Sequence, residues 1–327
     1  MIVESRFRPA AWCRNPHAQT VVAGLFRRPP ALDFNVETFE LADGDFLEVS
    51  VSTYAALSDA PVALICPGIN GTPDSPYVRG IVKALHNFGI RSAVLHYRGL
   101  MRPNRLPITF HSGRTEDITA VIDFLGERFP DAARVAVGYS LGGNMLLKYM
   151  GEHGQDSGLA AAAAVSVPFD LATCAKTIRH GLRRVYQRYL LEDLKAMIRA
   201  KQANNTLPLA AVDWPRLRSF AAFDDCVTAP LNGFANAADY YARASCGPFL
   251  ANITTPTLVI HARDDPFMTP AIIPPATHIP DAVRLELAHH GGHVGFVAGS
   301  RLGRPSYWLE HRIPKFIEAT LSTNVFG

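Results

Sequence analysis

After Pro61 the chain alternates short, continuous apolar segments with longer helical stretches, and this rhythm limits the folds that it can adopt. Strands that are apolar throughout belong to a sheet covered on both faces, and intervening helices make such strands parallel. We therefore expect an α/β fold with a mostly parallel central sheet and helices on both faces. The expected strands are Val62 to Cys66, Ser92 to His96, Val135 to Tyr139, Ala161 to Val167 and Thr257 to His261.

Two more strands are expected before this alternation begins. Val36 to Leu41 and Phe46 to Tyr54 flank the segment Ala42 to Asp45, whose Gly and Asp residues favour a tight turn. This pattern predicts an N-terminal antiparallel hairpin. Further along, Thr115 precedes a stretch with apolar residues on one helical face, and we expect Thr115 to cap that helix.

The interval 168–255 interrupts the alternation, because it holds a long amphipathic stretch and no convincing strand. A chain of 327 residues accommodates one core with an inserted subdomain, so we expect a single domain over residues 1–327 with a helical lid at 168–255. Its apolar residues at helical spacing are Ile178, Leu182, Val185, Tyr189, Leu194 and Ile198. Its basic residues are Lys176, Arg179, Arg183, Arg184, Arg188, Lys195, Arg199 and Lys201.

The basic side of this lid has two interpretations. The favoured one is an ordinary solvated helix surface. The other is attraction to an acidic substrate or to anionic lipid, which would give weak contact with a membrane surface.

A serine lies at the junction of a predicted strand and a predicted helix. Gly138-Tyr-Ser140-Leu-Gly142 has the form GxSxG, with the apolar strand directly before it and the helical run Met145 to Met150 after it. In this context the pattern is typical of a nucleophile elbow, whose sharp turn exposes the serine hydroxyl at the carboxyl end of the sheet. Ser140 is the predicted nucleophile.

A serine nucleophile needs an imidazole to take its proton and a carboxylate to orient the imidazole, in the chain order Ser, Asp, His for this elbow. Asp264 and Asp265 follow the strand that ends at His261. We favour Asp265 as the carboxylate because it lies just before Pro266 in the loop, and Asp264 is the second choice.

The predicted general base is His293. The segment Arg284 to Ala288 leads into His289-His290-Gly-Gly-His293, and the two glycines let this loop fold over the nucleophile. A metal cluster of the three histidines is the alternative, but no carboxylate lies at metal-ligand spacing. We expect no metal and no other cofactor.

The developing oxyanion needs two backbone donors, one after the nucleophile and one after an early strand. Leu141 supplies the first amide. The loop Cys66 to Gly71 follows the first core strand, and the amide of Ile69 is the expected second donor.

Two polar segments are further candidates for the pocket. His111 to Asp117 lines it or, equally, caps the following helix. Phe223 to Thr228 belongs to the predicted lid; it faces the site or, as we favour, forms a polar cluster that stabilises the lid.

Composition excludes several other classes of protein. Hydrophobic residues make up 48% and charged residues 19%, as in a soluble globular enzyme. A net charge of +3 without a long basic tract argues against nucleic-acid binding. Five scattered cysteines without a CxxC pair favour a reducing compartment. We expect a cytoplasmic protein, because there is no secretory signal and the longest apolar run, Leu159 to Val167, is too short to span a bilayer.

These segments together resemble the YheT-type branch of the α/β-hydrolase superfamily, which includes eukaryotic membrane-anchored lipases and fungal medium-chain ester synthase/esterases. The resemblance spans nearly the whole chain. It rests on Arg14 to Thr20, Pro67 to Gly71, His96 to Gly99, His111 to Gly113, Gly138 to Asn144, Phe223 to Asp225, His261 to Phe267 and His290 to Phe296.

The resemblance implies an α/β-hydrolase fold and a triad of Ser140, Asp265 and His293. It also implies hydrolysis of carboxylic esters with short to medium acyl chains, a small-molecule substrate. Two alternatives stay open: an acyltransferase or ester synthase that uses the same triad, and a non-catalytic binding protein with this fold.

Overall fold

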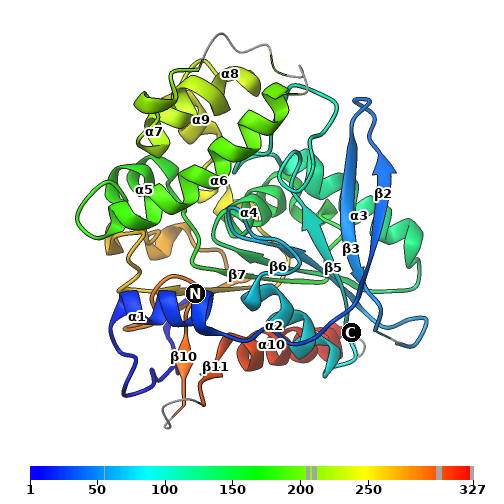
Figure 1. Cartoon of the computed structure of the whole chain (residues 1–327). Helices are drawn as coiled ribbons and strands as arrows, with labels where there is room; N and C mark the ends of the chain where they lie inside the picture. Colours follow the sequence, from blue (N-terminus) through cyan, green and yellow to red (C-terminus); the bar gives the residue numbers. More distant parts are fainter. Residues whose placement is uncertain (55, 204–206, 208–211, 300–303, 325–327) are drawn as a thin grey trace.

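The computed structural model describes residues 1–54, 56–203, 207, 212–299 and 304–324 (Figure 1). Its centre is a nine-stranded sheet in the order β1-β9-β8-β7-β6-β4-β5-β3-β2. The strands are β1 (Ile2–Glu4), β2 (Phe34–Glu40), β3 (Phe46–Ser52), β4 (Val62–Cys66), β5 (Arg91–His96), β6 (Arg134–Tyr139), β7 (Ala161–Val165), β8 (Thr257–Ala262) and β9 (Val283–Ala288). All pairs are parallel except β2 with β3 and β3 with β5.

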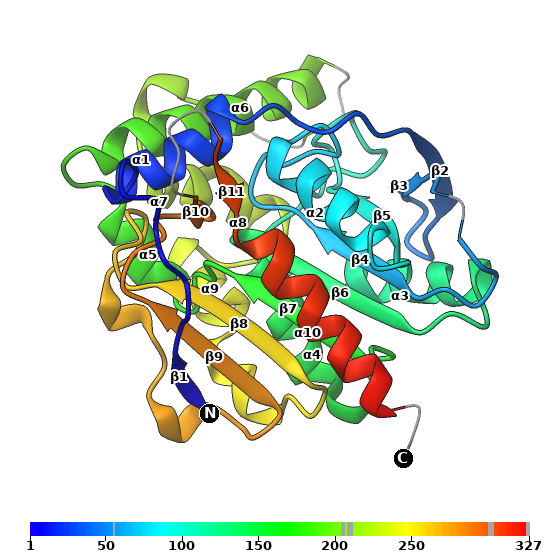
Figure 2. The ribbon, with the colours of Figure 1, turned by 90° about the horizontal axis from the view of Figure 1, so that it is seen from below.

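Helices cover both faces of this sheet, as the continuous apolar strands require. On one face lie α2 (Pro76–His86) and α10 (Leu309–Asn324), which are side by side in Figure 2. On the other lie α3 (Thr115–Arg128) and α4 (Leu141–His153). Alternate residues of β6 enter the two cores: Val135 and Val137 pack towards α2 and α10, and Ala136 packs towards α3 and α4. The predicted α/β-hydrolase architecture with a mostly parallel sheet is confirmed.

The predicted hairpin is confirmed, with β2 and β3 paired antiparallel from Phe34 to Glu40. Its turn closes as the Gly and Asp residues predict: Gly44 has φ +84°, and the Leu41 amide donates to the Asp45 carbonyl at 2.9 Å. The prediction missed β1, whose three residues pair parallel with β9.

Thr115 is not the helix cap that we predicted. Helix α3 begins at Thr115 itself, and Arg114 occupies the cap position without a side-chain hydrogen bond to the helix. The Thr115 hydroxyl instead donates to Glu152 Oε2 of α4 at 2.6 Å. The threonine therefore joins two helices, which its place in the sequence did not reveal.

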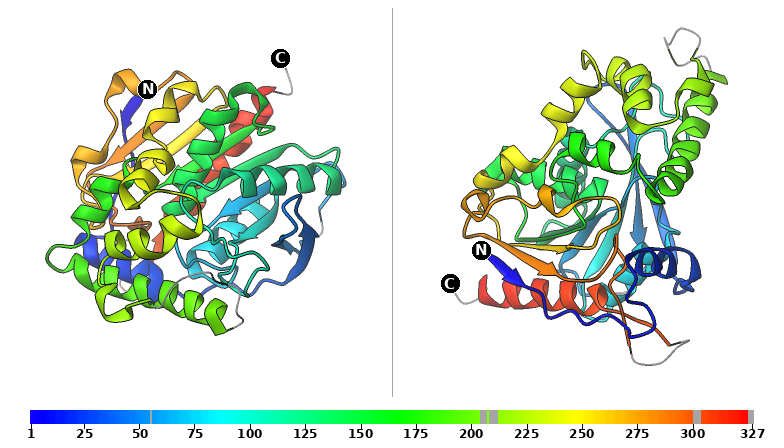
Figure 3. Two further views of the ribbon diagram at one scale, coloured as in Figure 1. Left: turned by 90° about the horizontal axis from the view of Figure 1, so that it is seen from above. Right: turned by 90° about the vertical axis from the view of Figure 1, so that its left-hand side faces the viewer.

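Between β7 and β8 the described residues form helices and turns, which gather on one side of the sheet (Figures 1 and 3). This stretch, the lid region (residues 168–255), includes 204–206 and 208–211, which lie outside the described residues. Its division from the core as a lid stays a prediction. Its helical elements are α5 (Leu171–Thr177), α6 (Arg183–Ala203), a 3₁₀ turn (Trp214–Arg216), α7 (Phe220–Phe223), a π-helical turn (Asp224–Thr228), α8 (Ala229–Leu231), α9 (Ala237–Ala244) and a second 3₁₀ segment (Gly247–Asn252).

The predicted faces of the long lid helix were partly wrong. Leu182, Val185 and Tyr189 were expected on the covered side, but they are 69%, 66% and 63% exposed. Lys195 and Lys201 were expected in solvent, yet both are buried. The cause is that the core contacts only the later turns of α6. There the buried Lys201 ammonium donates hydrogen bonds to the carbonyls of Leu106 and Ile108.

A buried ionic cluster ties the hairpin turn to the sheet and to α3. The guanidinium of Arg98, which follows β5, donates to Asp117 at 2.7 Å through Nη2 and to Asp43 at 2.6 Å through Nη1. Asp45 lies 3.4 Å from the same Nη1 and accepts from Asn104 at 2.5 Å. Arg98, Asp117 and Asp45 are all buried, and Arg114 joins them with its Nε 3.3 Å from Asp117 Oδ1. Mutual compensation within this cluster makes the buried charges tolerable.

The substitution Arg98→Ala should strongly destabilise the fold, because it removes the buried guanidinium that pairs with Asp117 and Asp45 and leaves Asp117 only the longer contact to Arg114. We expect the free energy of unfolding to fall by about 3–5 kcal/mol in urea titrations. Arg216→Ala, which breaks an exposed ion pair with Asp213, is the control and should cost at most about 1 kcal/mol. Equal losses in the two variants would contradict this assignment.

Candidate active site

Ser140 occupies a tight turn between β6 and α4. Its φ of +50° and ψ of −116° are unusual for a residue with a side chain, and such strain concentrates at functional sites. The turn requires glycine nearby: a Cβ on Gly142 would lie 2.2 Å from the Cys66 carbonyl oxygen. The Ser140 amide donates to Val165 O at 2.9 Å, which fixes the turn to the next strand.

The structure brings the three predicted residues together at the carboxyl ends of β6, β8 and β9. His293 Nε2 lies 2.9 Å from Ser140 Oγ, and His293 Nδ1 lies 2.8 Å from Asp265 Oδ2. An ionised carboxylate only accepts hydrogen bonds, so Nδ1 donates to Asp265 and leaves Nε2 to accept from the serine. Asp265 is 2% exposed, and its other oxygen accepts from the Phe267 amide at 2.8 Å.

Asp264, the second choice for the triad carboxylate, and the other two histidines of the loop make different contacts. Asp264 accepts from the Gly292 amide at 3.0 Å and lies 3.2 Å from His290 Nδ1, so its carboxyl holds the loop that carries the three histidines. Burial raises the pKa of the Asp264 carboxyl. His289 Nε2 lies 3.2 Å from Glu4 Oε1, and thus the three histidines of this loop have three separate carboxylate partners.

The two expected oxyanion donors both border the serine. Ile69 and Leu141 line one cavity with Ser140, and among the described residues neither amide N–H has a hydrogen-bond partner. The amide of Gly68, one residue before Ile69, instead donates to the Tyr77 hydroxyl at 2.8 Å. Asn70 Nδ2 donates to the Leu190 carbonyl at 2.9 Å, which joins this loop to α6.

An N-terminal segment that residue reasoning did not assign to the site holds the His293 loop. It comprises α1 (Pro16–Val21). The Thr20 hydroxyl accepts from the His293 amide at 2.9 Å, and Gln19 Oε1 accepts from the Val297 amide at 2.6 Å. In the sequence, the only indication that this segment matters was that Arg14 to Thr20 is one of the motifs of the family resemblance.

Aromatic rings continue this support around the imidazole. The Phe267 ring stacks on His293 with centroids 4.0 Å apart and planes within 3°. The ring centroid of Tyr186, on α6, lies 5.0 Å from that of Phe267. The Tyr186 hydroxyl lies 3.0 Å from Nδ1 of His17 on α1. The stack restricts rotation of His293 and links it to both α1 and α6, a role that residue reasoning had not given to Phe267.

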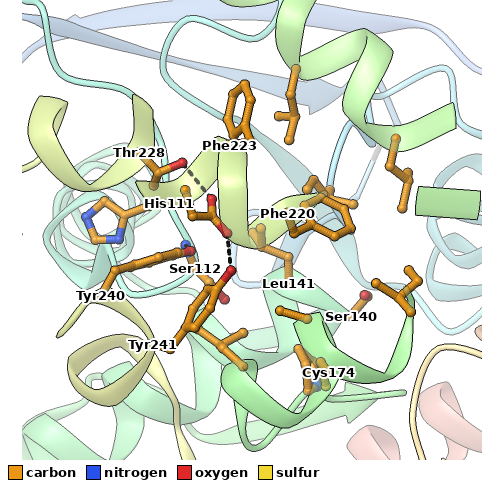
Figure 4. Close-up of a pocket in the computed structure, with 18 of the residues that line it drawn as sticks. His111, Ser112, Ser140, Leu141, Cys174, Phe220, Phe223, Thr228, Tyr240 and Tyr241 are labelled. Carbon is orange, nitrogen blue, oxygen red and sulfur yellow. Dashed lines mark hydrogen bonds between the residues drawn. The ribbon is translucent and has the colours of Figure 1, made fainter. Parts of the chain in front are cut away.

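A cavity of about 130 Å³ extends from Ser140 into the lid region (Figure 4). Most of its lining is apolar, with Phe220 and Phe223 from the lid region and Leu141 from α4. Polar groups lie on the side away from Ser140, where Thr228 and Tyr241 donate to the two oxygens of Asp224 at 2.7 and 2.6 Å. The cavity thus combines a long apolar wall with one buried carboxyl.

Both polar segments singled out in the sequence reach this cavity. His111 and Ser112 line it, and burial lowers the pKa of His111 to about 3. Asp224 and Thr228 line it too and also bond α9 through Tyr241, so they face the site and stabilise the lid region at once.

The described ranges contain no helix long and apolar enough to cross a membrane. They also contain no group of three or more His, Cys, Asp or Glu side chains arranged to hold a metal ion. The cytoplasmic location stays a prediction.

Comparison with known proteins defines the class. Residues 61–300 match the model of the alpha/beta hydrolase fold family. The chain is 41% identical to the candidate esterase YheT of Escherichia coli over 97% of this chain and 94% of that protein. It is 28% identical to the human phospholipase ABHD3, covering 97% of this chain and 80% of that protein.

Solved structures agree on the fold. The Pyrococcus furiosus esterase Pf2001 superposes with a TM-score of 0.56 at 14% identity, over 89% of this chain and 92% of that one. The chain therefore belongs to the α/β-hydrolase family, in its YheT-type branch. The family match and the Escherichia coli relative, which is named as an esterase, support a hydrolase.

Burial of Asp224 should make stability depend on pH, because burial raises the pKa of its carboxyl from 3.8 to about 6. The folded protein then keeps a proton that the unfolded chain releases, so this stabilisation is full below pH 4 and is lost as the pH rises through 6. Between pH 4 and pH 8 the unmodified chain should lose about 2 kcal/mol more unfolding free energy than Asp224→Asn.

Urea titrations at both pH values measure this difference. Asp225→Asn is the matched control, because Asp225 is exposed, and it should keep the pH dependence of the unmodified chain. An Asp224→Asn variant with an unchanged pH profile would refute the role of this carboxyl.

Proposed function

We propose that the protein is a serine carboxylic-ester hydrolase that works through an acyl-serine intermediate. The observation that carries the proposal is the hydrogen-bonded chain Ser140–His293–Asp265 at the edge of an apolar cavity. The relatives support esters as substrates, since they include proteins named as an esterase, a phospholipase and a monoacylglycerol lipase.

In the first half-reaction, Ser140 Oγ attacks the ester carbonyl carbon while its proton passes to His293 Nε2. Asp265 holds Nδ1–H and stabilises the imidazolium that forms. The amides of Ile69 and Leu141 stabilise the oxyanion. The tetrahedral intermediate then collapses, the bond to the alcohol oxygen breaks, and the alcohol leaves with the proton from His293.

The second half-reaction repeats these roles with water. His293 takes a proton from water as the oxygen attacks the acyl carbon, and the same two amides stabilise the second oxyanion. The bond to Ser140 Oγ breaks, the carboxylic acid leaves, and Ser140 recovers its proton from His293. Every proton taken in one step is returned in the next.

The cavity supports an acyl chain of short to medium length. Its walls near Ser140 are apolar, as an alkyl chain requires, and its volume of about 130 Å³ is small. Cys174 also lines it, but burial raises the pKa of that thiol well above its usual value. A protonated thiol is a weak nucleophile, which favours Ser140.

Acyl transfer to an alcohol would use the same residues and the same acyl-serine. Product analysis with added alcohol separates the two reactions: free acid alone at high alcohol supports hydrolysis, and a new ester supports transfer. A non-catalytic binding role predicts that Ser140 does not react with a fluorophosphonate probe.

The substitution Ser140→Ala should lower kcat for p-nitrophenyl esters by about 10⁴-fold or more, because it removes the nucleophile but leaves the cavity and the amides in place. Ser58→Ala changes an exposed serine outside the site and is the matched control, with unchanged turnover expected. Full activity in Ser140→Ala would rule out the proposed nucleophile.

Acyl-chain preference should shift when the cavity is filled. Ala175 of α5 is buried in the lining, so Ala175→Phe should reduce kcat/KM for medium-chain esters by about tenfold or more while short-chain esters change little. Ala172→Phe places the same ring on the exposed side of α5, and its chain-length profile should match the unmodified chain. A profile unaltered by Ala175→Phe would place the acyl group elsewhere.

A further inference from the structure

Large apolar side chains are exposed on two segments beside the candidate active site. Leu25 and Phe26 end a π-helical turn (Val22–Phe26) and are 70% and 76% exposed. Leu182, just before α6, and Val185 and Tyr189 on its first two turns form a stripe at helical spacing and are also exposed. These five residues are called the apolar rim, and gathered exposed apolar side chains of this kind mark interaction surfaces.

The two segments of the apolar rim are neighbours in space. His17 of α1 hydrogen-bonds and stacks with Tyr186, which lies next to Val185 on α6. Figures 2 and 3 show α1 beside the first turns of α6. The π-helical turn continues directly from α1, so Leu25 and Phe26 lie on the same side of the molecule as the stripe.

The apolar rim lies around an opening to Ser140. A second cavity of about 200 Å³ is lined by Gly24 of the π-helical turn and Leu190 of α6, and also by Ser140 and His293. Gly24 is exposed, so this cavity reaches the surface at the residue that precedes Leu25. A substrate that enters here passes between the two segments of the apolar rim.

Exposed basic side chains accompany both segments of the apolar rim. Arg28 follows the π-helical turn, and Arg179, Arg184 and Arg188 lie near the stripe; all four are exposed. None of them forms a salt bridge within the described part of the chain. Of the carboxylates on α6, Glu192 accepts from Lys195 and Asp193 from Asn70. Lys195, together with the charges of Arg199 and Arg188, lowers the pKa of the Glu192 carboxyl, so the charge of Arg188 is compensated in part and those of Arg28, Arg179 and Arg184 carry the argument.

We propose that the apolar rim docks on the surface of an anionic lipid bilayer and that ester substrate enters the cavity from there. Apolar side chains that enter the acyl boundary and basic side chains that meet anionic headgroups are the two components of interfacial binding. A bilayer fits this surface better than a protein partner does, because a protein seated on the apolar rim would close the opening. The substrate route rests on the proposed function, whereas the docking does not.

Vesicle co-sedimentation tests the docking, with the full chain carrying Ser140→Ala so that no lipid is consumed. We expect binding to vesicles of phosphatidylcholine mixed with phosphatidylglycerol and much weaker binding to phosphatidylcholine alone. Arg184→Gln with Arg188→Gln should weaken binding to the mixed vesicles by about 30-fold, since each basic residue contributes about fivefold near an anionic surface. Leu25→Ser with Phe26→Ser should weaken it by about tenfold or more.

Matched controls separate docking from general charge and hydrophobicity. Leu57→Ser removes an apolar side chain that is 79% exposed elsewhere, and Arg216→Gln with Arg243→Gln removes the same charge from another part of the lid region; both should bind as before. Absence of binding to the mixed vesicles, or equal losses in the controls, would overturn the proposal.

Self-association without vesicle binding would overturn it too, if the apolar-rim substitutions abolish that association, because the surface would then cover a second copy. A failure of the proposed function appears instead as missing ester turnover by the unmodified chain. The vesicle result with Ser140→Ala is independent of that outcome.

Discussion

The position of Ser140 depends on a backbone-to-backbone contact between the first turn of α4 and the end of β4. Gly142 approaches Cys66 and Pro67 so closely that a Cβ would lie 2.2 and 2.3 Å from their carbonyl oxygens. Gly138 meets Gly142 in the same way, with a Cβ 2.7 Å from its carbonyl oxygen. This close approach brings the amide of Leu141 and the loop of Ile69 to the same side of Ser140, where an oxyanion would form.

The imidazole side of the site is held by distant parts of the chain. Thr20 and His293 are 273 positions apart, yet their hydrogen bond anchors the loop that carries the imidazole. Phe267 stacks on one face of the ring, and Tyr186 connects that stack to α6. Movement of α1 or α6 would thus reach His293 directly. The apolar rim lies at the start of α6 and on the π-helical turn that continues α1, so the proposed docking and the orientation of the imidazole share one support.

Local patterns in the sequence were sufficient for much of the fold and for the core of the site. Continuous apolar runs predicted β4 to β8, and the strand-to-helix junction singled out Ser140. Asp265 could be favoured over Asp264 because it lies just before Pro266. The catalytic roles of Asp265, Ser140 and His293 stay predictions. These features depend on residues close together in the chain, which periodicity and turn chemistry describe well.

Contacts between distant segments left no local signal. Strand β1 has only three residues and gains its partners from β9. No periodicity or turn pattern around Gln19 and Thr20 indicates that they bond to the loop near residue 293. On α6, periodicity grouped residues by face but did not tell which turns the core covers, so Tyr189 is in solvent and Lys201 is buried. Lys201 is tolerated inside because two backbone carbonyls and Asn104 accept from its ammonium.

The central claim is that the acyl group is transferred to Ser140, and locating that group in the protein tests it most directly. The chain is mixed with a medium-chain p-nitrophenyl ester, quenched in acid during turnover, digested and analysed by mass spectrometry. The account predicts one acyl group per chain, on Ser140. An acyl group on Cys174, the thiol in the same cavity, or turnover without any acylated residue would contradict it.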